Sequence, residues 1–273
     1  MQKNETLKTI ASLRTTHWGF SEKKVSREDI EIIIEHSLRT ANSDNLTDYS
    51  VIVVDDPETL QKITGGESSG SSGVCLVYAV DHTRIVRCAE ALGYRDFYPT
   101  NRLYNFLISL YDVHAAAQTA VIAAKSMEID SLVTNFSHRH HPEKIKKLLH
   151  MPEKYCFPVI QVVLGYSERP VEETTGRLSK KHVSHYGTYR PVEEIDTQEI
   201  IREMDGVYPG YISEKYPHAL DWYFNEWLLE WYDEETHREL VESLCRSGLI
   251  CREDLALMGK MAVEAGRAKP QKG

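Results

Sequence analysis

Residues 102–127 read RLYNFLISLYDVHAAAQTAVIAAKSM, a pattern that predicts one long helix of roughly 37 Å. Its second half carries six alanines: Ala115, Ala116, Ala117, Ala120, Ala123 and Ala124. Small side chains let another helix approach closely. We therefore expect a central core helix or a dimer helix here, rather than a helix on the surface.

Residues 158–166, PVIQVVLGY, give the clearest strand pattern, because they are apolar and β-branched and end at Gly165. Shorter strands are predicted at 51–54 (VIVV) and 74–80 (VCLVYAV), and a further one within 130–136. Helices are predicted between them, at 26–39 with a capping-box-like start at Ser26 and Asp29, after Asp56-Pro57, and from Pro142 to Leu149. Strands that alternate with helices indicate an α/β or α+β protein.

The composition is that of an ordinary globular chain. It has 273 residues, 41% of them hydrophobic, and a formal net charge of −9. These values exclude collagen-like, disordered and disulfide-scaffold classes, and the acidic balance gives no basic face for nucleic acid. The five scattered cysteines form no CxxC pair, the N-terminus lacks a signal-peptide core, and no apolar run approaches 18 residues. We expect a cytoplasmic protein that binds neither nucleic acid nor membrane.

The chain changes character at about residue 191, which predicts two parts, 1–190 and 191–273. The second part is helical in pattern, and residues 208–232 hold nine aromatic residues. Trp227 and Trp231 are four residues apart, and Phe224 is predicted on their face of a helix. This aromatic stripe either packs on the core or a partner subunit, or forms a lid over a ligand.

Three polar segments are candidate ligand sites: 14–20 (RTTHWGF), 40–49 (TANSDNLTDY) and 175–182 (TGRLSKKH). Arg14 with the hydroxyls of Thr15 and Thr16 can cradle a phosphate, and Arg177 leads a second cationic cluster. Taken singly, each segment is also compatible with a surface turn or a solvated charge run.

The order of these segments resembles the nitroreductase family of flavoproteins over roughly residues 6–190. An Arg-hydroxyl turn at 14–20 precedes an amphipathic helix, and an Asn-rich turn at 40–49 leads into a strand. The Ala-rich helix, Leu164-Gly165-Tyr166 and Arg177-Leu178 complete the succession. Thr15 and Trp18 stand where the family usually has basic residues, and Thr134-Asn135 stands where Glu-Gly or Gly-Gly is usual.

The resemblance implies an α+β fold with a central, mostly antiparallel sheet flanked by helices, in a homodimer that binds FMN at the subunit interface. The segment 191–273 would be a helical C-terminal extension packed on the same domain or on the partner subunit. The resemblance places Arg14, Thr15, Thr16, Trp18 and Arg177 near the FMN phosphate. It places Asn42, Asn45 and Thr47 near the flavin ring or ribityl chain, and Thr134 and Asn135 near N5, with the Thr134 backbone amide facing that atom.

The implied function is an FMN-dependent oxidoreductase in which NAD(P)H reduces the flavin and a nitroaromatic, quinone or related acceptor reoxidises it by a ping-pong route. Other flavin chemistry on the same fold, such as reductive dehalogenation or flavin breakdown, is an alternative, as is a non-catalytic flavin-binding protein. No catalytic side chain is assigned, because the cofactor carries the chemistry.

Three histidines, His138, His140 and His141, stand close together in SHRHHPEK. Adjacent histidines in an extended loop point to different sides, and no cysteine or carboxylate flanks them at zinc spacing. We therefore predict an exposed loop and no metal site; a contact of His138 or His140 with substrate or nicotinamide phosphate is the functional alternative.

Overall fold

The computed structural model describes residues 4–16, 19–65, 73–94, 103–139, 141–168, 176–191, 195–228 and 234–251. The chain forms two compact units, one of residues 1–170 with 238–273 and one of residues 171–237. The predicted division at 190/191 remains a prediction.

The first unit is built on a four-stranded sheet of order β1-β2-β4-β3, in which all neighbours are antiparallel. The predicted strands are confirmed. Their bounds are Tyr49–Val54 (β1), Val74–Asp81 (β2), Asp130–Thr134 (β3) and Cys156–Gly165 (β4).

Both faces of the sheet are covered, so the strand β2 is buried along its whole length. Its residues Leu76 and Tyr78 pack into a core shared with α2 (Arg27–Ser37) and α5 (Leu103–Ser126). The alternate residues Cys75 and Val77 face a second core under α3 (Pro57–Thr64). Successive residues of β2 therefore point to opposite faces of the sheet. Because both faces are covered, the sequence of this strand is apolar without interruption.

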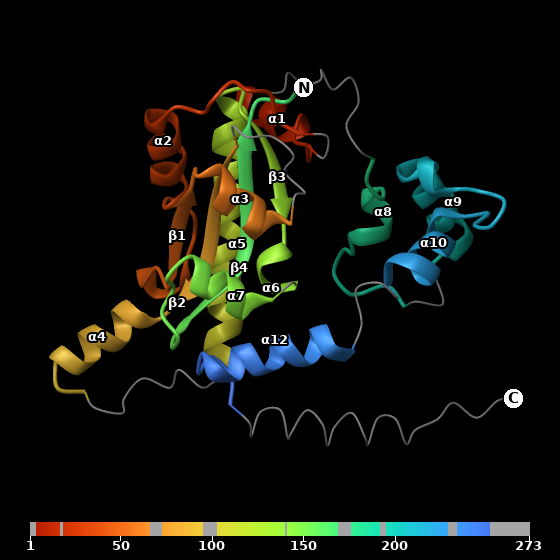
Figure 1. The fold of residues 1–273 in the computed structure, drawn as a ribbon. Coiled ribbons are helices and arrows are strands. Elements are labelled where there is room, and N and C mark those ends of the chain that lie inside the picture. The colour runs from red at the N-terminus through yellow and green to blue at the C-terminus, as the bar shows by residue number, and fades with distance from the viewer. Residues whose placement is uncertain are drawn as a thin grey trace, which may run out of the picture. The chain divides into compact units, whose positions relative to one another are not determined.

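The helix α5 is the predicted central helix, and it runs along the sheet beside α2 (Figure 1). Ala116, Ala120 and Ala124 on it are fully buried. By length and composition alone α5 could cross a membrane, since its mean hydropathy is 1.3 over an 18-residue window. Its packing against sheet and helix accounts for that apolar character.

Local signals in the sequence set the helix starts. Ser26 accepts a hydrogen bond from the Asp29 amide at 3.0 Å and caps α2, and Asp56 accepts one from the Thr59 amide at 2.8 Å and caps α3. The helix predicted at 26–39 is shorter than expected at its C-terminal end, because α2 ends at Ser37 and Leu38 is 46% exposed.

The remaining helices of the first unit are α1 (Glu5–Ala11), η1 (Ser43–Asn45), α4 (Thr83–Ala91), α6 (Phe136–Arg139) and α7 (Pro142–Leu148). The helix α12 (Glu234–Arg246) begins near the unit boundary, and its C-terminal part belongs to the first unit. Lys146 on α7 donates hydrogen bonds to the Ser247 hydroxyl at 2.7 Å and to the Glu153 carbonyl at 2.9 Å. The buried ammonium thus ties the end of the described chain to the core of this unit.

The second unit is helical over its described residues. It contains α8 (Lys180–Val183), α9 (Thr197–Val207), η3 (Pro209–Tyr211), α10 (Ala219–Trp222) and a π-helical turn, η4 (Tyr223–Trp227). The predicted charged helix at 252–265 lies outside the described residues.

Candidate functional site

The segment Arg14–Thr16 lies against the start of β3. The Thr16 amide donates to the Ser131 carbonyl at 2.9 Å. Arg14 Nη2 lies 3.4 Å from Asp130 Oδ1, and Lys125 Nζ lies 3.1 Å from the same oxygen. Thr15 is half-buried. The Arg14 guanidinium is therefore held in place by a carboxylate that it shares with a second cation.

Two buried polar atoms of the predicted site have no hydrogen-bond partner in the described part of the chain, Thr16 Oγ1 and Asn42 Oδ1. Thr16 is 1% exposed. A buried hydroxyl or amide oxygen normally has a partner, so these two atoms mark places where a polar ligand can bind.

The segment Asn42–Thr47 forms a strained turn before β1. Asp44, Asn45 and Thr47 have positive φ angles of 53°, 55° and 55°. Such angles are costly for residues other than glycine and persist only where the surroundings impose them.

One anchor of this turn is Asp112 of α5, whose two carboxylate oxygens each lie 3.1 Å from the Ser43 amide that donates to them. Burial raises the pKa of Asp112, and the hydrogen bond from Ser43 opposes that shift. Asp112 is the only acidic residue in α5, so an acid in an apolar helix was the signal that could have identified it from sequence.

The other anchor is Arg84 of α4. Its Nη2 donates to the Thr47 and Tyr49 carbonyls at 2.7 and 2.6 Å, and its Nη1 donates to Ser50 Oγ at 2.8 Å. Nothing in the sequence near residue 84 pointed to this role, because the partners lie 34–37 residues away.

We expect Arg84→Met to weaken FMN binding about tenfold, because the end of the turn and the start of β1 lose three hydrogen bonds and the strained residues relax. Fluorescence titration of the apoprotein with FMN measures this. Arg87→Met is the matched control, since Arg87 lies on the same helix and forms an exposed ion pair with Glu90. Equal FMN affinities in the two variants would contradict the role given to Arg84.

Thr134 and Asn135 lie at the far end of β3. Thr134 is buried, its Oγ1 accepts from the Phe136 amide at 3.2 Å, and the Asn135 carbonyl accepts from the His138 and Arg139 amides at 3.2 Å each. These bonds end the strand and start α6. Arg14, Thr16 and Thr134 are thus gathered along one edge strand.

The turn Asn42–Thr47 lies at the opposite end of the sheet from Arg14. Arg14 is beside Asp130, which pairs with Gly165 at the end of β4, whereas the turn leads into Tyr49, whose partner Val80 pairs with Phe157 near the start of β4. A strand of this length separates its ends by roughly 30 Å. Within one chain the two groups of predicted residues do not meet.

Two further residues predicted at the site are Arg177 and Trp18. Arg177 belongs to the second unit, where its Nη1 donates to the Gly176 carbonyl at 2.8 Å. Trp18 lies outside the described residues.

The exposed loop predicted around His138 is wrong at that residue. His138 is on α6, half-buried, and its Nδ1 lies within hydrogen-bond distance of the Val159 carbonyl. Burial lowers its pKa. His138 is therefore a packed residue that joins α6 to β4, while His140 lies outside the described residues.

The aromatic segment stacks within the second unit. The rings of Tyr211 and Trp222 are 4.0 Å apart, and those of Tyr223 and Trp227 are 5.1 Å apart. Together with Met204, Tyr208, Ala219 and Leu220 they line a cavity. Trp227 stacks on Tyr223, while Phe224, which was predicted on the same helix face as Trp227, is 58% exposed. A role as lid or as subunit contact remains a prediction.

No family model matches the chain. A Cr(VI) reductase from a Pseudomonas species is 32% identical over 171 residues, which are 60% of this chain and 68% of that protein. An FMN reductase [NAD(P)H] from Bacillus subtilis is 27% identical over 217 residues, 78% of this chain and 84% of that protein. The fold matches the oxidoreductase YcnD from Bacillus subtilis at a TM-score of 0.79 and 23% identity, over 91% of this chain and 99% of that one. It also matches nitroreductase A from Vibrio parahaemolyticus at a TM-score of 0.73 and 21% identity, over 89% of this chain and 98% of that one.

The chain belongs to the nitroreductase family. The predicted nitroreductase-like α+β fold and the prediction of an oxidoreductase are confirmed by these relatives and structures.

Proposed function

We propose that this chain is an FMN-dependent NAD(P)H oxidoreductase that reduces a nitroaromatic, quinone or related acceptor by a ping-pong route. The observation that carries the proposal is the relationship to an FMN reductase [NAD(P)H] over 217 aligned residues. The predicted cofactor agrees with the name of a further Bacillus subtilis relative, an FMN reductase (NADPH). An NAD(P)H-using enzyme with this composition is proposed to work in the cytoplasm.

The residues of the structure fit FMN. Arg14 and Thr16 offer a guanidinium and a buried hydroxyl without a partner, the donors that suit a phosphate. Asn42 offers a buried amide oxygen without a partner, which suits a hydroxyl or ring N–H donor. The Asn42–Thr47 turn is held by Asp112 and Arg84 before any ligand arrives, which lowers the cost of binding.

When bound, FMN would supply the chemistry of hydride transfer from NAD(P)H to the acceptor. The residues of the chain would orient the cofactor and shield it from solvent. Arg14 holds the phosphate end, with Asp130 fixing its guanidinium, and Asn45 and Thr47 contact the ring region. A Thr134 amide that donates to N5 would favour the negative charge that develops there during reduction.

The separation of the two groups along the sheet supports the proposal of a homodimer. Arg14 and Thr16 at one end, and Asn42 and Asn45 at the other, cannot both contact one FMN from the same chain. A second copy related by a twofold axis would bring the Asn42–Thr47 turn of one chain to the Arg14 end of the other.

The first test is an anaerobic absorbance spectrum of the purified protein before and after NAD(P)H. We expect a flavin spectrum that bleaches, and parallel lines in initial-rate plots with a quinone acceptor. A flavin spectrum that NAD(P)H leaves unchanged would contradict the reductase, and a protein that stays colourless with added FMN would contradict the cofactor site.

The shared site is tested by mixing subunits. Arg14→Ala and Asn45→Ala homodimers are each expected to bind FMN weakly. In a dimer that carries one of each chain, one site receives both substitutions and the other receives neither. We therefore expect strong FMN binding at about half the wild-type occupancy. Occupancy no greater than that of the homodimers would show that both residues act on the same FMN from one chain.

A further inference from the structure

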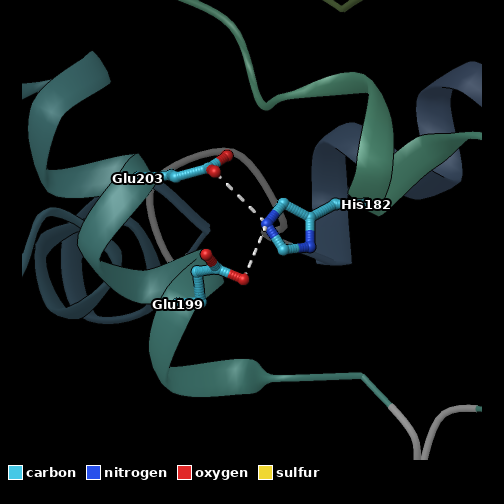
Figure 2. Close-up of side chains that lie close together, drawn as sticks. All are labelled: His182, Glu199 and Glu203. Carbon is cyan, nitrogen blue, oxygen red and sulfur yellow. Dashed lines mark ion pairs between the residues drawn. The ribbon is translucent and has the colours of Figure 1, made fainter.

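The second unit contains a cluster of three ligand-type side chains that the flavin site does not use. His182 comes from α8, and Glu199 and Glu203 come from α9. One ligand atom of each lies within 4.8 Å of the other two. Figure 2 shows the imidazole pointing between the two carboxylates, with one ring nitrogen facing both.

Helical spacing and a third residue orient the carboxylates. Glu199 and Glu203 are four residues apart and therefore lie on the same face of α9. Glu203 accepts hydrogen bonds from the Ser179 amide at 2.9 Å and the Ser179 hydroxyl at 3.0 Å. The hydrogen bond from the Ser179 amide lowers the pKa of Glu203 to about 2, so this carboxylate is ionised at neutral pH.

His182 supplies the independent observation. Its side chain is 5% exposed, and Nε2 lies 3.3 Å from Glu203 and 3.8 Å from Glu199. Yet Nε2 has no hydrogen-bond partner in the described part of the chain. A buried ring nitrogen aimed at two carboxylate oxygens requires a positive species between them, either a proton or a metal ion.

The charge of the cluster favours a divalent ion. Lys181 donates a hydrogen bond to Glu199 and lies 3.5 Å from Glu203, so one ammonium balances two carboxylates. The Lys181 side chain is 50% exposed and can turn toward solvent. A divalent ion would neutralise both carboxylates and use the imidazole nitrogen as well.

We propose that His182, Glu199 and Glu203 bind a zinc ion. One imidazole nitrogen and two carboxylate oxygens, with water in a fourth position, form a ligand set that zinc accepts. The ion joins α8 to α9, Ser179 orients one ligand, and Lys181 competes for the site. The residues lie 40 or more positions after the histidines that the sequence suggested, so local spacing gave no signal of them.

Zinc binding to the full-length, FMN-loaded protein tests the proposal by equilibrium dialysis and metal analysis. We expect wild type to hold one more zinc per chain than His182→Ala. His218→Ala is the matched control, because His218 also contacts a carboxylate, Asp205 at 2.8 Å, but belongs to no such three-ligand group in the described chain. It should bind zinc like wild type.

Lys181→Met is expected to change zinc affinity in the opposite direction. Removing the competing ammonium should tighten zinc binding about fivefold, the factor that an exposed ion pair corresponds to. Ser179→Ala, which frees Glu203, should weaken it about tenfold. These changes separate a metal site from a site that simply needs a folded unit, since the two substitutions act in opposite directions.

A thermal shift keeps the test valid if a variant folds poorly. Zinc should raise the melting temperature of wild type and Lys181→Met but not that of His182→Ala or His182→Gln. Equal zinc binding and equal thermal shifts in wild type and both His182 variants would overturn the proposal. The cluster would then be an ion-pair network that joins α8 to α9 without metal.

Discussion

Gly165→Val is expected to lower the free energy of unfolding by at least about 3 kcal/mol. A Cβ at Gly165 would lie 2.4 Å from Phe20 Cγ and 2.8 Å from Phe20 Cβ. These atoms are close to the backbone of a residue that is 2% exposed, so the ring cannot move aside alone. Phe20 also forms an antiparallel β-bridge with Ser167. The backbone at Phe20 must shift, and we expect FMN binding to fall as well.

Urea unfolding followed by circular dichroism measures the change. Gly206→Ala is the control, because a Cβ at Gly206 meets nothing within 4 Å and the residue lies in α9. That substitution should be neutral or stabilise by up to about 1 kcal/mol. A Gly165→Val protein as stable as wild type would show that the Phe20 ring has another place to pack.

Lowering the pH from 6.5 to 4 is expected to remove about 3 kcal/mol of stability through His82 alone. His82 is fully buried, and burial lowers its pKa to about 4. Between the two pKa values the unfolded chain binds a proton that the folded protein does not. Stability is therefore fully present above pH 6.5 and is lost as the pH falls toward 4.

The hydrogen bonds of His82 make a suitable variant available. Its Nε2 lies 2.7 Å from Ser109 Oγ, which itself donates to the Asn105 carbonyl at 3.0 Å, so Nε2 carries the proton of the neutral ring. His82→Gln keeps a donor toward Ser109 and removes the titration. Free energies of unfolding between pH 4 and 7 should fall less steeply for this variant. Parallel pH profiles for the two proteins would contradict the role given to His82.

Local sequence patterns predicted most elements of the first unit. The strands at 51–54, 74–80 and 158–166 are apolar in both alternate sets because helices cover both faces of the sheet. Ser26 and Asp56 predicted the starts of their helices because the capping hydrogen bond joins residues three positions apart. The helix at 26–39 was predicted too long because the apolar pattern continues past the residue where the helix ends.

The candidate site was predictable in its residues but not in its layout. Arg14, Thr16, Asn42 and Asn45 could be chosen because the order of short motifs resembles a family. The anchors Arg84 and Asp130 could not, because they make contacts across 34 to 116 positions. A side chain that hydrogen-bonds to a distant part of the chain produces no periodic pattern in the sequence.

The sequence by itself determined the family, the oxidoreductase class, the strands and the long central helix, since these depend on composition, periodicity and motif order. Only the tertiary structure showed that Arg14 and Asn42 lie at opposite ends of one sheet. It alone placed His182 beside Glu199 and Glu203. The reason is physical. Antiparallel pairing and helix packing bring residues together according to the register of the strands and the faces of the helices. The spacing along the sequence of the residues that meet predicts neither.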